Sequence, residues 1–224
     1  MSASKAIEDY LKCIYKLEDP QVQNKGVHTS AIASRLGVAQ ASVSNMIKKL
    51  SDQDFVKYEP YYGVSLTDSG RQVALQMIRR HRVIEQYLVE RLNYSWDEVD
   101  EEAEVLEHAV SDKLVNAMWL ALGEPSHDPH GSPIPDADGL ITPQNLVPLT
   151  ELEETKPAKL ARIKNRSPEE LRYLSSIGLA MGVELIVQSK APFNGPLMLE
   201  VAGRCHALDY RMACALMVEA ESEL

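Results

Sequence analysis

The stretch "VHTSAIASRLGVAQASVSNMIKKL", residues 27–50, decides the fold together with "FVKYEPYYGVSLTDSG", residues 55–70. The first stretch predicts a short helix, a turn and a second helix. Ala33, Gly37 and Val43 fall where a helix-turn-helix needs a small residue, a flexible turn and an apolar contact. A helical hairpin of another kind would show a similar pattern. The second stretch favours the helix-turn-helix, because it alternates as two short strands and ends at a residue, Thr67 or Asp68, that can cap a new helix. Together they predict a winged helix-turn-helix.

The exposed front of the second helix in such a domain can enter the major groove of double-stranded DNA. Polar side chains there reach base edges and phosphates, and the wing adds contacts to the DNA backbone. Taken singly, each of these side chains is an ordinary solvated residue, so the prediction rests on the set. The predicted DNA-contacting residues are Gln40, Ser42, Ser44, Asn45, Lys48, Lys49 and Tyr62.

The charges of the chain are divided unevenly. The overall net charge of −10 argues against binding to DNA. However, residues 1–82 carry 12 Lys and Arg against 8 Asp and Glu, net +4, whereas residues 83–224 carry 11 against 25, net −14. The basic first third can face phosphates, and the acidic remainder can bind cations.

The rest of the chain extends this domain on both sides. Apolar residues at helical spacing predict helices over 4–18, 68–92, from Ser95 through an S-x-x-E capping box with Glu98, and from Ser111 to Leu122. Three apolar helices without a partner strand indicate a pairing surface and therefore a homodimer. Residues 125–157 are rich in Pro and Gly and read as loop and linker. Beyond them, "GVELIVQ", "GPLMLEV" and "ACALMVE" predict short strands after a helix "SPEELRYLSSIGL", which suits a small SH3-type barrel.

The predicted fold class is therefore mainly α with small β. We expect a winged helix-turn-helix DNA-binding domain over 1–72, a helical metal-binding and dimerisation domain over 73–142, a linker over 143–157 and an SH3-like domain over 158–224. No apolar run approaches the ~18 residues of a membrane span, so we expect a soluble cytoplasmic protein with no membrane partner. The three cysteines lack metal-ligand spacing and are expected to be reduced thiols.

The segment "EEAEVLEHAVSD", residues 101–112, crowds Glu104, Glu107 and His108 into about one helical turn. Residues at i, i+3 and i+4 share a helix face, so the three side chains form either a metal site or a solvated acidic patch. His81 and Glu85 repeat the i, i+4 spacing on the preceding helix, and an acidic Asp9 interrupts the first one. These additions favour a cation site.

These segments resemble the diphtheria-toxin-repressor and manganese-transport-regulator family of metal-dependent repressors. The resemblance lies in "EDYLKCIYKLED", "VSLTDSG", "RRHRVIEQYL", "EEAEVLEHAVSD" and "DPHGSPIP", which occur in this order from residue 8 to residue 135. The final 70 or so residues resemble the family's optional SH3-like domain less closely.

The resemblance implies a primary regulatory metal site at Asp9, Glu104, Glu107 and His108, with His81 near it or shared with a second site. The iron-responsive type of the family has Met at the position of Asp9 and Cys at that of Glu104. Hard oxygen ligands suit Mn²⁺, so the resemblance implies manganese, with Fe²⁺ as the alternative. Lys12 stands where some manganese-type members have a further Glu ligand, and because a lysine there cannot bind a cation, the resemblance does not imply a binuclear site at this spot.

The resemblance also implies an ancillary site, and hence two sites per subunit. Its ligands would be Glu85, Asp128 and His130, with His81 as a ligand shared with the primary site and Glu170 closing the site from the third domain. His127 and Glu169 are close alternatives. The competing interpretation of this segment is a proline-rich loop whose histidines are solvated.

The hypothesis is then a repressor of metal-homeostasis genes that binds palindromic operator DNA as a dimer when it is loaded with metal. Two other classes stay open at this point. A hydrolytic metalloenzyme would use the same ligands, but it has no evident use for a winged helix, and the sequence shows no separate nucleophile or phosphate loop. A winged-helix regulator that senses an organic ligand would leave the clustered carboxylates without a role.

Overall fold

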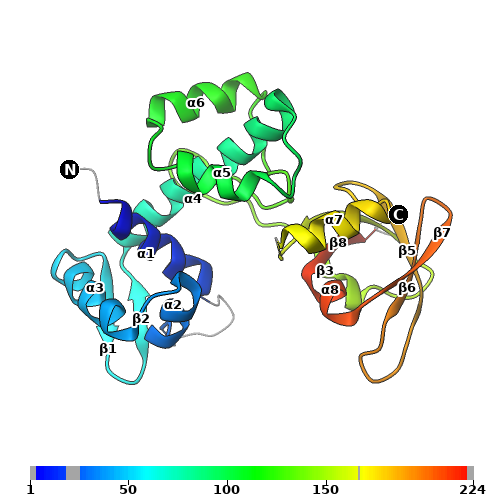
Figure 1. The fold of residues 1–224 in the computed structure, drawn as a ribbon, viewed down its shortest axis with the longest axis horizontal. Helices are drawn as coiled ribbons and strands as arrows, with labels where there is room; N and C mark the ends of the chain where they lie inside the picture. Colours follow the sequence, from blue (N-terminus) through cyan, green and yellow to red (C-terminus); the bar gives the residue numbers. More distant parts are fainter. Residues whose placement is uncertain (1–3, 19–25, 166, 221–224) are drawn as a thin grey trace. The chain divides into compact units, whose positions relative to one another are not determined.

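The computed structural model describes residues 4–18, 26–165 and 167–220 (Figure 1). The chain forms two units, which are Met1–Arg80 with Pro135–Leu140, and His81–Ile134 with Ile141–Leu224. Helix α4, Asp68–Leu92, contributes residues to both units. The four-part division expected from the sequence stays a prediction.

The first unit is a winged helix-turn-helix, as predicted. Its elements are α1 (Lys5–Leu17), α2 (Thr29–Leu36), α3 (Gln40–Asp52), β1 (Val56–Glu59), β2 (Gly63–Leu66) and the first turns of α4. Gly37 ends α2 in the left-handed conformation, with φ of 65°, which suits glycine and lets the chain turn into α3. β1 and β2 pair antiparallel from Val56↔Leu66 to Glu59↔Gly63 and form the wing.

A single apolar core fixes the helices of this unit. Leu11 and Ile14 of α1 are fully buried, as are Ile32 of α2 and Val43 of α3. Val64 of β2 joins the same cluster. Because one face of α3 is committed to this core, its opposite face is left to solvent.

The second unit begins with three helices: the remainder of α4, α5 (Val99–Leu106) and α6 (Asp112–Ala121). α4 and α5 pack through Ile84, Leu88, Val99 and Ala103, all nearly or fully buried. The prediction that α5 begins at Ser95 is wrong. Ser95 and Glu98 do form the expected hydrogen bonds, with Ser95 Oγ donating to Glu98 Oε2 at 2.6 Å, but they close a turn before the helix.

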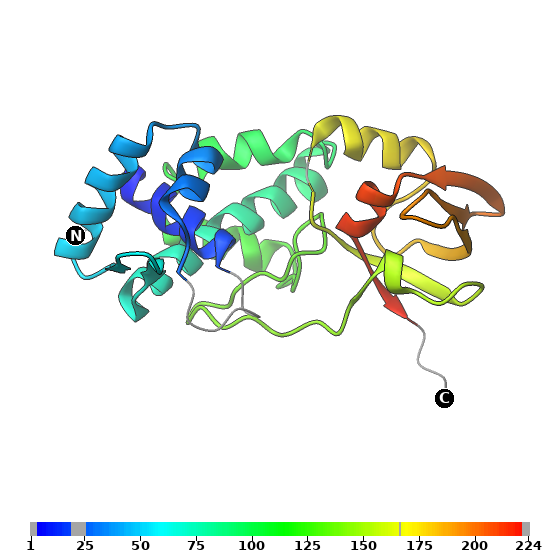
Figure 2. The ribbon, with the colours of Figure 1, turned by 90° about the horizontal axis from the view of Figure 1, so that it is seen from below.

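The same unit continues into a six-stranded antiparallel sheet in the order β3-β8-β4-β5-β6-β7. Figure 2 shows this part of the chain from below, coloured from yellow-green to red. The members of the sheet are β3 (Val147–Pro148), β4 (Pro157–Ile163), β5 (Glu184–Lys190), β6 (Leu197–Val201), β7 (Arg204–Leu208) and β8 (Leu216–Ala220), with the short helix η1 (Leu149–Glu151), α7 (Pro168–Ser176) and α8 (Tyr210–Ala215). A cluster of buried aliphatic side chains, including Leu160, Val187 and Leu199, forms its core. These residues, 147–220, are called the C-terminal domain below.

The secondary structure of this domain differs from the sequence-based expectation in several details, and β4 and β7 were not among the expected strands. The segment "ACALMVE" was expected to be a strand throughout, but its first three residues end α8. Asp209 explains this, because its side chain accepts hydrogen bonds from the backbone N–H groups of Arg211 and Met212 and so caps a helix. The expected linker also contains β3 and η1.

Within the described ranges, no helix combines the length and the apolar composition needed to cross a membrane.

Candidate metal centre

Polar stripes on α4 and α5 run beside the apolar stripes that pack these helices together. On α4, His81 and Glu85 lie one turn apart next to the buried Ile84. On α5, the next residue after each buried Val99 and Ala103 is acidic, namely Asp100 and Glu104. Packing of the apolar stripes therefore places the imidazole and carboxylates of one helix against the carboxylates of the other.

His81 is the centre of this arrangement. Its Nδ1 lies 2.7 Å from Glu107 Oε2 and 4.0 Å from Glu104 Oε1. Its Nε2 lies 3.3 Å from Asp100 Oδ1 and 3.4 Å from Glu85 Oε1. Ligand atoms of His81, Glu104 and Glu107 lie within 4.8 Å of one another, as do those of His81, Glu85 and Asp100.

The pKa of His81 reflects these carboxylates. Burial alone would lower it, but the charge of Glu85 and hydrogen bonds to Asp100 and Glu107 outweigh burial and raise the pKa to about 10. The imidazolium form therefore balances part of the negative charge when no cation is present. The same carboxylates would favour a divalent cation for the same reason.

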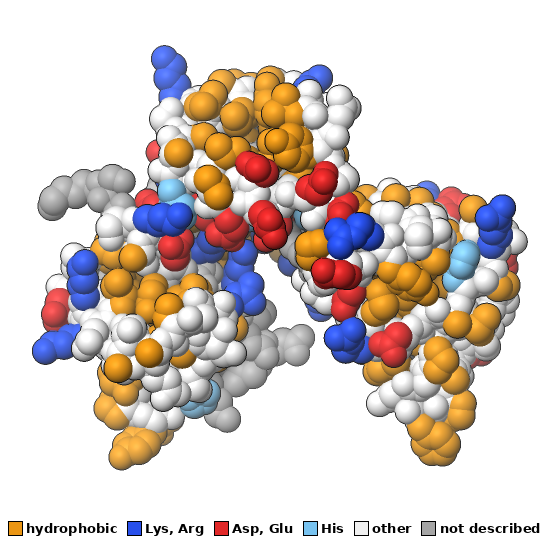
Figure 3. Space-filling model, in the orientation of Figure 1, with side chains coloured by type: hydrophobic (Ala, Val, Ile, Leu, Met, Phe, Trp, Pro, Cys, Tyr) orange, Lys and Arg blue, Asp and Glu red, His pale blue; other side chains and the backbone are white. Residues whose placement is uncertain are grey.

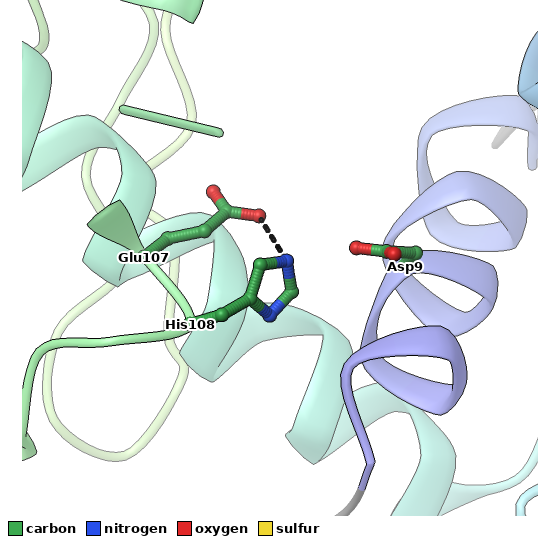
Figure 4. Close-up of side chains that lie close together, drawn as sticks. All are labelled: Asp9, Glu107 and His108. Atoms are coloured by element: carbon green, nitrogen blue, oxygen red, sulfur yellow. Dashed lines mark ion pairs between the residues drawn. The ribbon is translucent and has the colours of Figure 1, made fainter. Parts of the chain in front are cut away.

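Glu107 and His108 follow the last helical residue of α5, so they lie in the turn after the helix rather than within it. Glu107 is fully buried, and its Oε1 lies 3.6 Å from His108 Nε2 (Figure 4). Thus Glu107 contacts both His81 and His108, one with each carboxylate oxygen.

A second group of ligand atoms joins Glu85 to the loop "DPHGSPIP". Atoms of Glu85, Asp128 and His130 lie within 4.8 Å of one another, and all three residues are buried. Asp128 Oδ1 accepts hydrogen bonds from the backbone N–H groups of His130, at 2.9 Å, and Ser132, at 2.8 Å, which hold the loop closed. Arg82 Nε lies 3.6 Å from the other carboxylate oxygen.

The orientation of the His130 ring suits a metal ligand. Its Nε2 donates to the backbone carbonyl of Trp96 at 2.8 Å, which leaves Nδ1 unprotonated in the neutral ring. Nδ1 faces Glu85 Oε1 at 3.6 Å and has no hydrogen-bond partner among the described residues. Metal-binding histidines commonly donate their other N–H to a carbonyl in this way. A buried lone pair that faces a buried carboxylate fits a cation between them.

The structure brings most, but not all, of the predicted ligands together. The cluster in the second unit contains His81, Glu85, Glu104, Glu107, His108, Asp128 and His130. Asp9 lies on α1, and Lys12, one turn later, is buried. Asp9 belongs to the first unit, so its role in the site stays a prediction.

The predicted closing ligand Glu170 is engaged elsewhere. It accepts from Arg211 at 2.9 Å and from Asn165, and it belongs to none of the ligand groups found among the described residues. The alternatives His127 and Glu169 also lie outside the ligand groups found among the described residues. The His127 ring is hydrogen-bonded to Ser126, and Glu169 accepts a hydrogen bond from Ser167. A role for Glu170 as a ligand therefore stays a prediction.

One candidate ligand, Asp100, was not predicted from the sequence. Asp100 contacts His81 and completes the group with Glu85. The signal was present, because Asp100, Glu104 and Glu107 follow the i, i+4, i+7 spacing of one helix face. The crowding of acidic residues at 98–102 concealed it.

Two surfaces outside the cluster bear on function. On α3, the predicted DNA-contacting side chains from Gln40 to Lys49 are all exposed, and Tyr62 of the wing is 60% exposed. In the second unit, Leu114 and Leu120 of α6 and Val105 of α5 are exposed although apolar. Figure 3 shows hydrophobic side chains gathered over the part of the molecule that contains α5 and α6.

Comparison with known proteins accounts for these features. Residues 3–64 match the model described as "Iron dependent repressor, N-terminal DNA binding domain". Residues 67–136 match "Iron dependent repressor, metal binding and dimerisation domain", and residues 147–220 match the FeoA domain. The fold and the cluster thus define a metal-dependent transcriptional repressor.

Full-length relatives agree with this class. The iron-dependent repressor IdeR of Mycobacterium bovis is 32% identical over 224 residues, covering 95% of this chain and 96% of its own. A solved "Manganese-dependent transcriptional repressor complex with manganese" is 39% identical with a TM-score of 0.87, covering 96% of this chain and 100% of that one. The manganese regulator SloR is 33% identical with a TM-score of 0.76, covering 99% and 100%.

The chain therefore belongs to the family of metal-dependent repressors that includes IdeR and the diphtheria toxin repressor. The resemblance inferred from the sequence is confirmed. Members of this family are DNA-binding transcriptional repressors, which removes the metalloenzyme alternative.

Proposed function

We propose that this protein is a manganese-responsive repressor that binds palindromic operators as a homodimer when metal-loaded. The observation that carries the proposal is the donor set, in which every member is a carboxylate oxygen or an imidazole nitrogen. Such donors suit Mn²⁺, whereas thiolate and thioether donors favour softer or later metals. Two of the similar solved structures are described as manganese regulators, which supports the same metal.

We assign two cation sites to each chain. The primary site would use Glu104, Glu107 and His108, with Asp9 added by the family resemblance. The ancillary site would use Glu85, Asp128 and His130, and His81 adjoins both. A divalent cation at either site would neutralise carboxylates that otherwise repel one another. A role for Glu170 in the second site is retained only as an expectation of the resemblance.

The residues of the chain supply the link to DNA. Asp9 is carried by α1, whose apolar face packs into the same core as the recognition helix α3. Asp9 and Glu107 would both hold the cation, which would favour an arrangement in which both are ligands, and operator binding would be strengthened if that arrangement also suits DNA. The recognition residues on α3 and Tyr62 on the wing would then contact bases and phosphates.

The homodimer is supported by the exposed apolar side chains of α5 and α6. Leu114 is 46% exposed and Leu120 is 53% exposed, and the matched domain is described as a dimerisation domain. Dimers place two recognition helices about one DNA turn apart, ~34 Å, which calls for a palindromic operator. A cytoplasmic location accords with DNA as the partner and stays a prediction.

Calorimetric titration with Mn²⁺ tests the two sites. The wild-type chain should bind two Mn²⁺ ions, Glu107→Gln should lose one, and Glu85→Gln should lose the other. Glu101→Gln is the matched control, because Glu101 is an exposed residue of α5 outside every ligand group found in the described ranges. Unchanged stoichiometry in both cluster variants would contradict the assignment.

A metal panel tests the manganese response. Duplexes enriched from a random-sequence library by the Mn²⁺-loaded protein serve as operator, and affinity is measured at one salt concentration with Mn²⁺, Fe²⁺, Co²⁺ and Zn²⁺. Saturating Mn²⁺ should raise the affinity for operator DNA from its value in chelator to its full value. Activation by Fe²⁺ without activation by Mn²⁺ would identify an iron-responsive protein, in line with the IdeR relative. Full affinity in chelator would instead favour an organic effector.

A further inference from the structure

Trp96 lies in the turn before α5, but its ring contacts the C-terminal domain. The indole is half-buried and packs against the apolar core of the C-terminal domain. Its Nε1 donates to Ser175 Oγ on α7 at 2.8 Å. The neighbouring Asp97 accepts from Arg172 of the same helix at 2.9 Å. Because the Arg172 side chain is 57% exposed, that ion pair contributes little, and the indole makes the main contact.

The same residue also holds His130 of the ancillary ligand group. The Trp96 carbonyl accepts from His130 Nε2 at 2.8 Å. The two rings stack, with centroids 6.2 Å apart and an interplanar angle of 12°. Trp96 therefore fixes both the tautomer and the orientation of the imidazole whose Nδ1 faces Glu85.

His130 is attached to the C-terminal domain on its other side as well. Its own carbonyl accepts from the backbone N–H of Ile163 in β4 at 2.9 Å. The ligand group at Glu85, Asp128 and His130 thus lies where two attachments to the C-terminal domain meet, one to β4 and one, through Trp96, to α7.

We propose that Trp96 is a positioning residue. It couples cation binding at Glu85, Asp128 and His130 to the packing of α7 against the turn before α5. The proposal rests on the ancillary site of the proposed function. His130 Nδ1 would hold the cation, which would make Nε2–H a stronger donor and so strengthen its hydrogen bond to the Trp96 carbonyl. The hydrogen bond from the indole N–H to Ser175 Oγ fixes Trp96 and so holds its carbonyl in place. Because thermodynamic coupling is reciprocal, packing of α7 against this turn raises the affinity for the cation. The factor is the same as that by which the bound cation favours the packing.

Hydrogen exchange of the α7 amides in the full-length protein tests this coupling. In the wild type, saturating Mn²⁺ should slow exchange of the α7 amides about threefold to tenfold, the range that one net hydrogen bond supplies. Ser175→Ala removes the acceptor for the indole N–H at an exposed position and should abolish the Mn²⁺-dependent slowing. Trp96→Phe keeps an aromatic ring but removes the N–H, and should do the same.

Tyr173→Phe is the matched control. It removes a different hydrogen bond of α7, from Tyr173 Oη to the Ala207 carbonyl within the C-terminal domain. This variant should keep the Mn²⁺-dependent slowing. A purely structural role for Ser175 would change α7 exchange equally with and without Mn²⁺, which would overturn the proposal.

Calorimetry on the same samples separates the two ideas. If Glu85→Gln loses one Mn²⁺ ion but wild-type α7 exchanges equally with and without Mn²⁺, the coupling through Trp96 is wrong and the ancillary site stands. If Ser175→Ala keeps the slowing, the coupling does not pass through this bond. If Glu85→Gln keeps the full Mn²⁺ stoichiometry, the ancillary site is wrong and the coupling with it.

Discussion

Gly131 of the ligand loop lies directly against β4 of the C-terminal domain, so Gly131→Ala tests the docking seen in the structure. A Cβ atom at this position would lie 1.9 Å from the carbonyl oxygen of Ala161 and 2.9 Å from Arg162 Cα. Both are backbone atoms of β4, so no side-chain rotation can relieve the clash. The φ of Gly131, +78°, is also left-handed.

The expected loss of stability is the sum of two contributions. The left-handed backbone costs an alanine ~1–2 kcal/mol. Relief of the clash has to move the loop away from β4, which breaks the bond from Ile163 N–H to the His130 carbonyl and costs about 1 kcal/mol or more. The total is about 2–4 kcal/mol.

Gly182→Ala is the matched control. Gly182 has φ of +76° and lies in the same unit, but no atom lies within 4 Å of its added Cβ. It should lose only the backbone contribution, ~1–2 kcal/mol, and any effect of alanine on the unfolded chain cancels between the two variants.

Urea unfolding supplies the assay. In a Trp119→Phe background the chain keeps a single tryptophan, Trp96, whose fluorescence reports on its packing against the C-terminal core. Gly131→Ala should lose at least about 1 kcal/mol more than Gly182→Ala, since it alone carries the clash. Equal losses in the two variants would refute the docking of this loop on β4.

Three further predictions concern the first unit and the metal. Lys48→Ala should weaken binding to specific and scrambled duplexes alike, because an exposed lysine on α3 neutralises a phosphate. The magnitude of the slope of log affinity against log salt should fall by about 1, which anisotropy titrations over a salt series measure. Burial raises the pKa of the Cys13 thiol, so a disulfide reagent at pH 8 should modify it at least about tenfold more slowly than the two exposed cysteines, and equal rates would contradict its burial. Asp9→Met combined with Glu104→Cys should raise operator affinity in Fe²⁺ relative to Mn²⁺, and an unchanged ratio would remove these positions from metal selection.

Much of the first unit was predictable because its signals are local. The Gly37 turn, the buried Val43 and the alternation of residues 55–66 each depend on a few neighbouring residues, and the structure confirms the winged helix they predict. The β7 strand gave no such signal, because "RCHAL" lacks the apolar alternation of a strand and depends on pairing with β6.

The sequence predicted site residues within single helices but not the contacts between helices. The i, i+4 spacing of His81 and Glu85 is visible in the sequence, but their contact with Asp100 depends on how α4 packs on α5. The role of Trp96 was hidden for the same reason, since its partners on α7 lie about 80 residues further along the chain. The end of α5 at Leu106 was missed because Glu107 and His108 keep a helix-like spacing beyond it.

Operator affinity with and without manganese tests the central claim most directly. The wild-type protein is titrated against the library-enriched duplex at one fixed salt concentration, first in chelator and then in saturating Mn²⁺, with Glu107→Gln alongside. Linkage between a buried metal site and the DNA-binding form predicts a gain of ~5- to 150-fold in Mn²⁺ for the wild type, and little or none for Glu107→Gln. Equal affinity of the wild type in chelator and in Mn²⁺ would contradict the account.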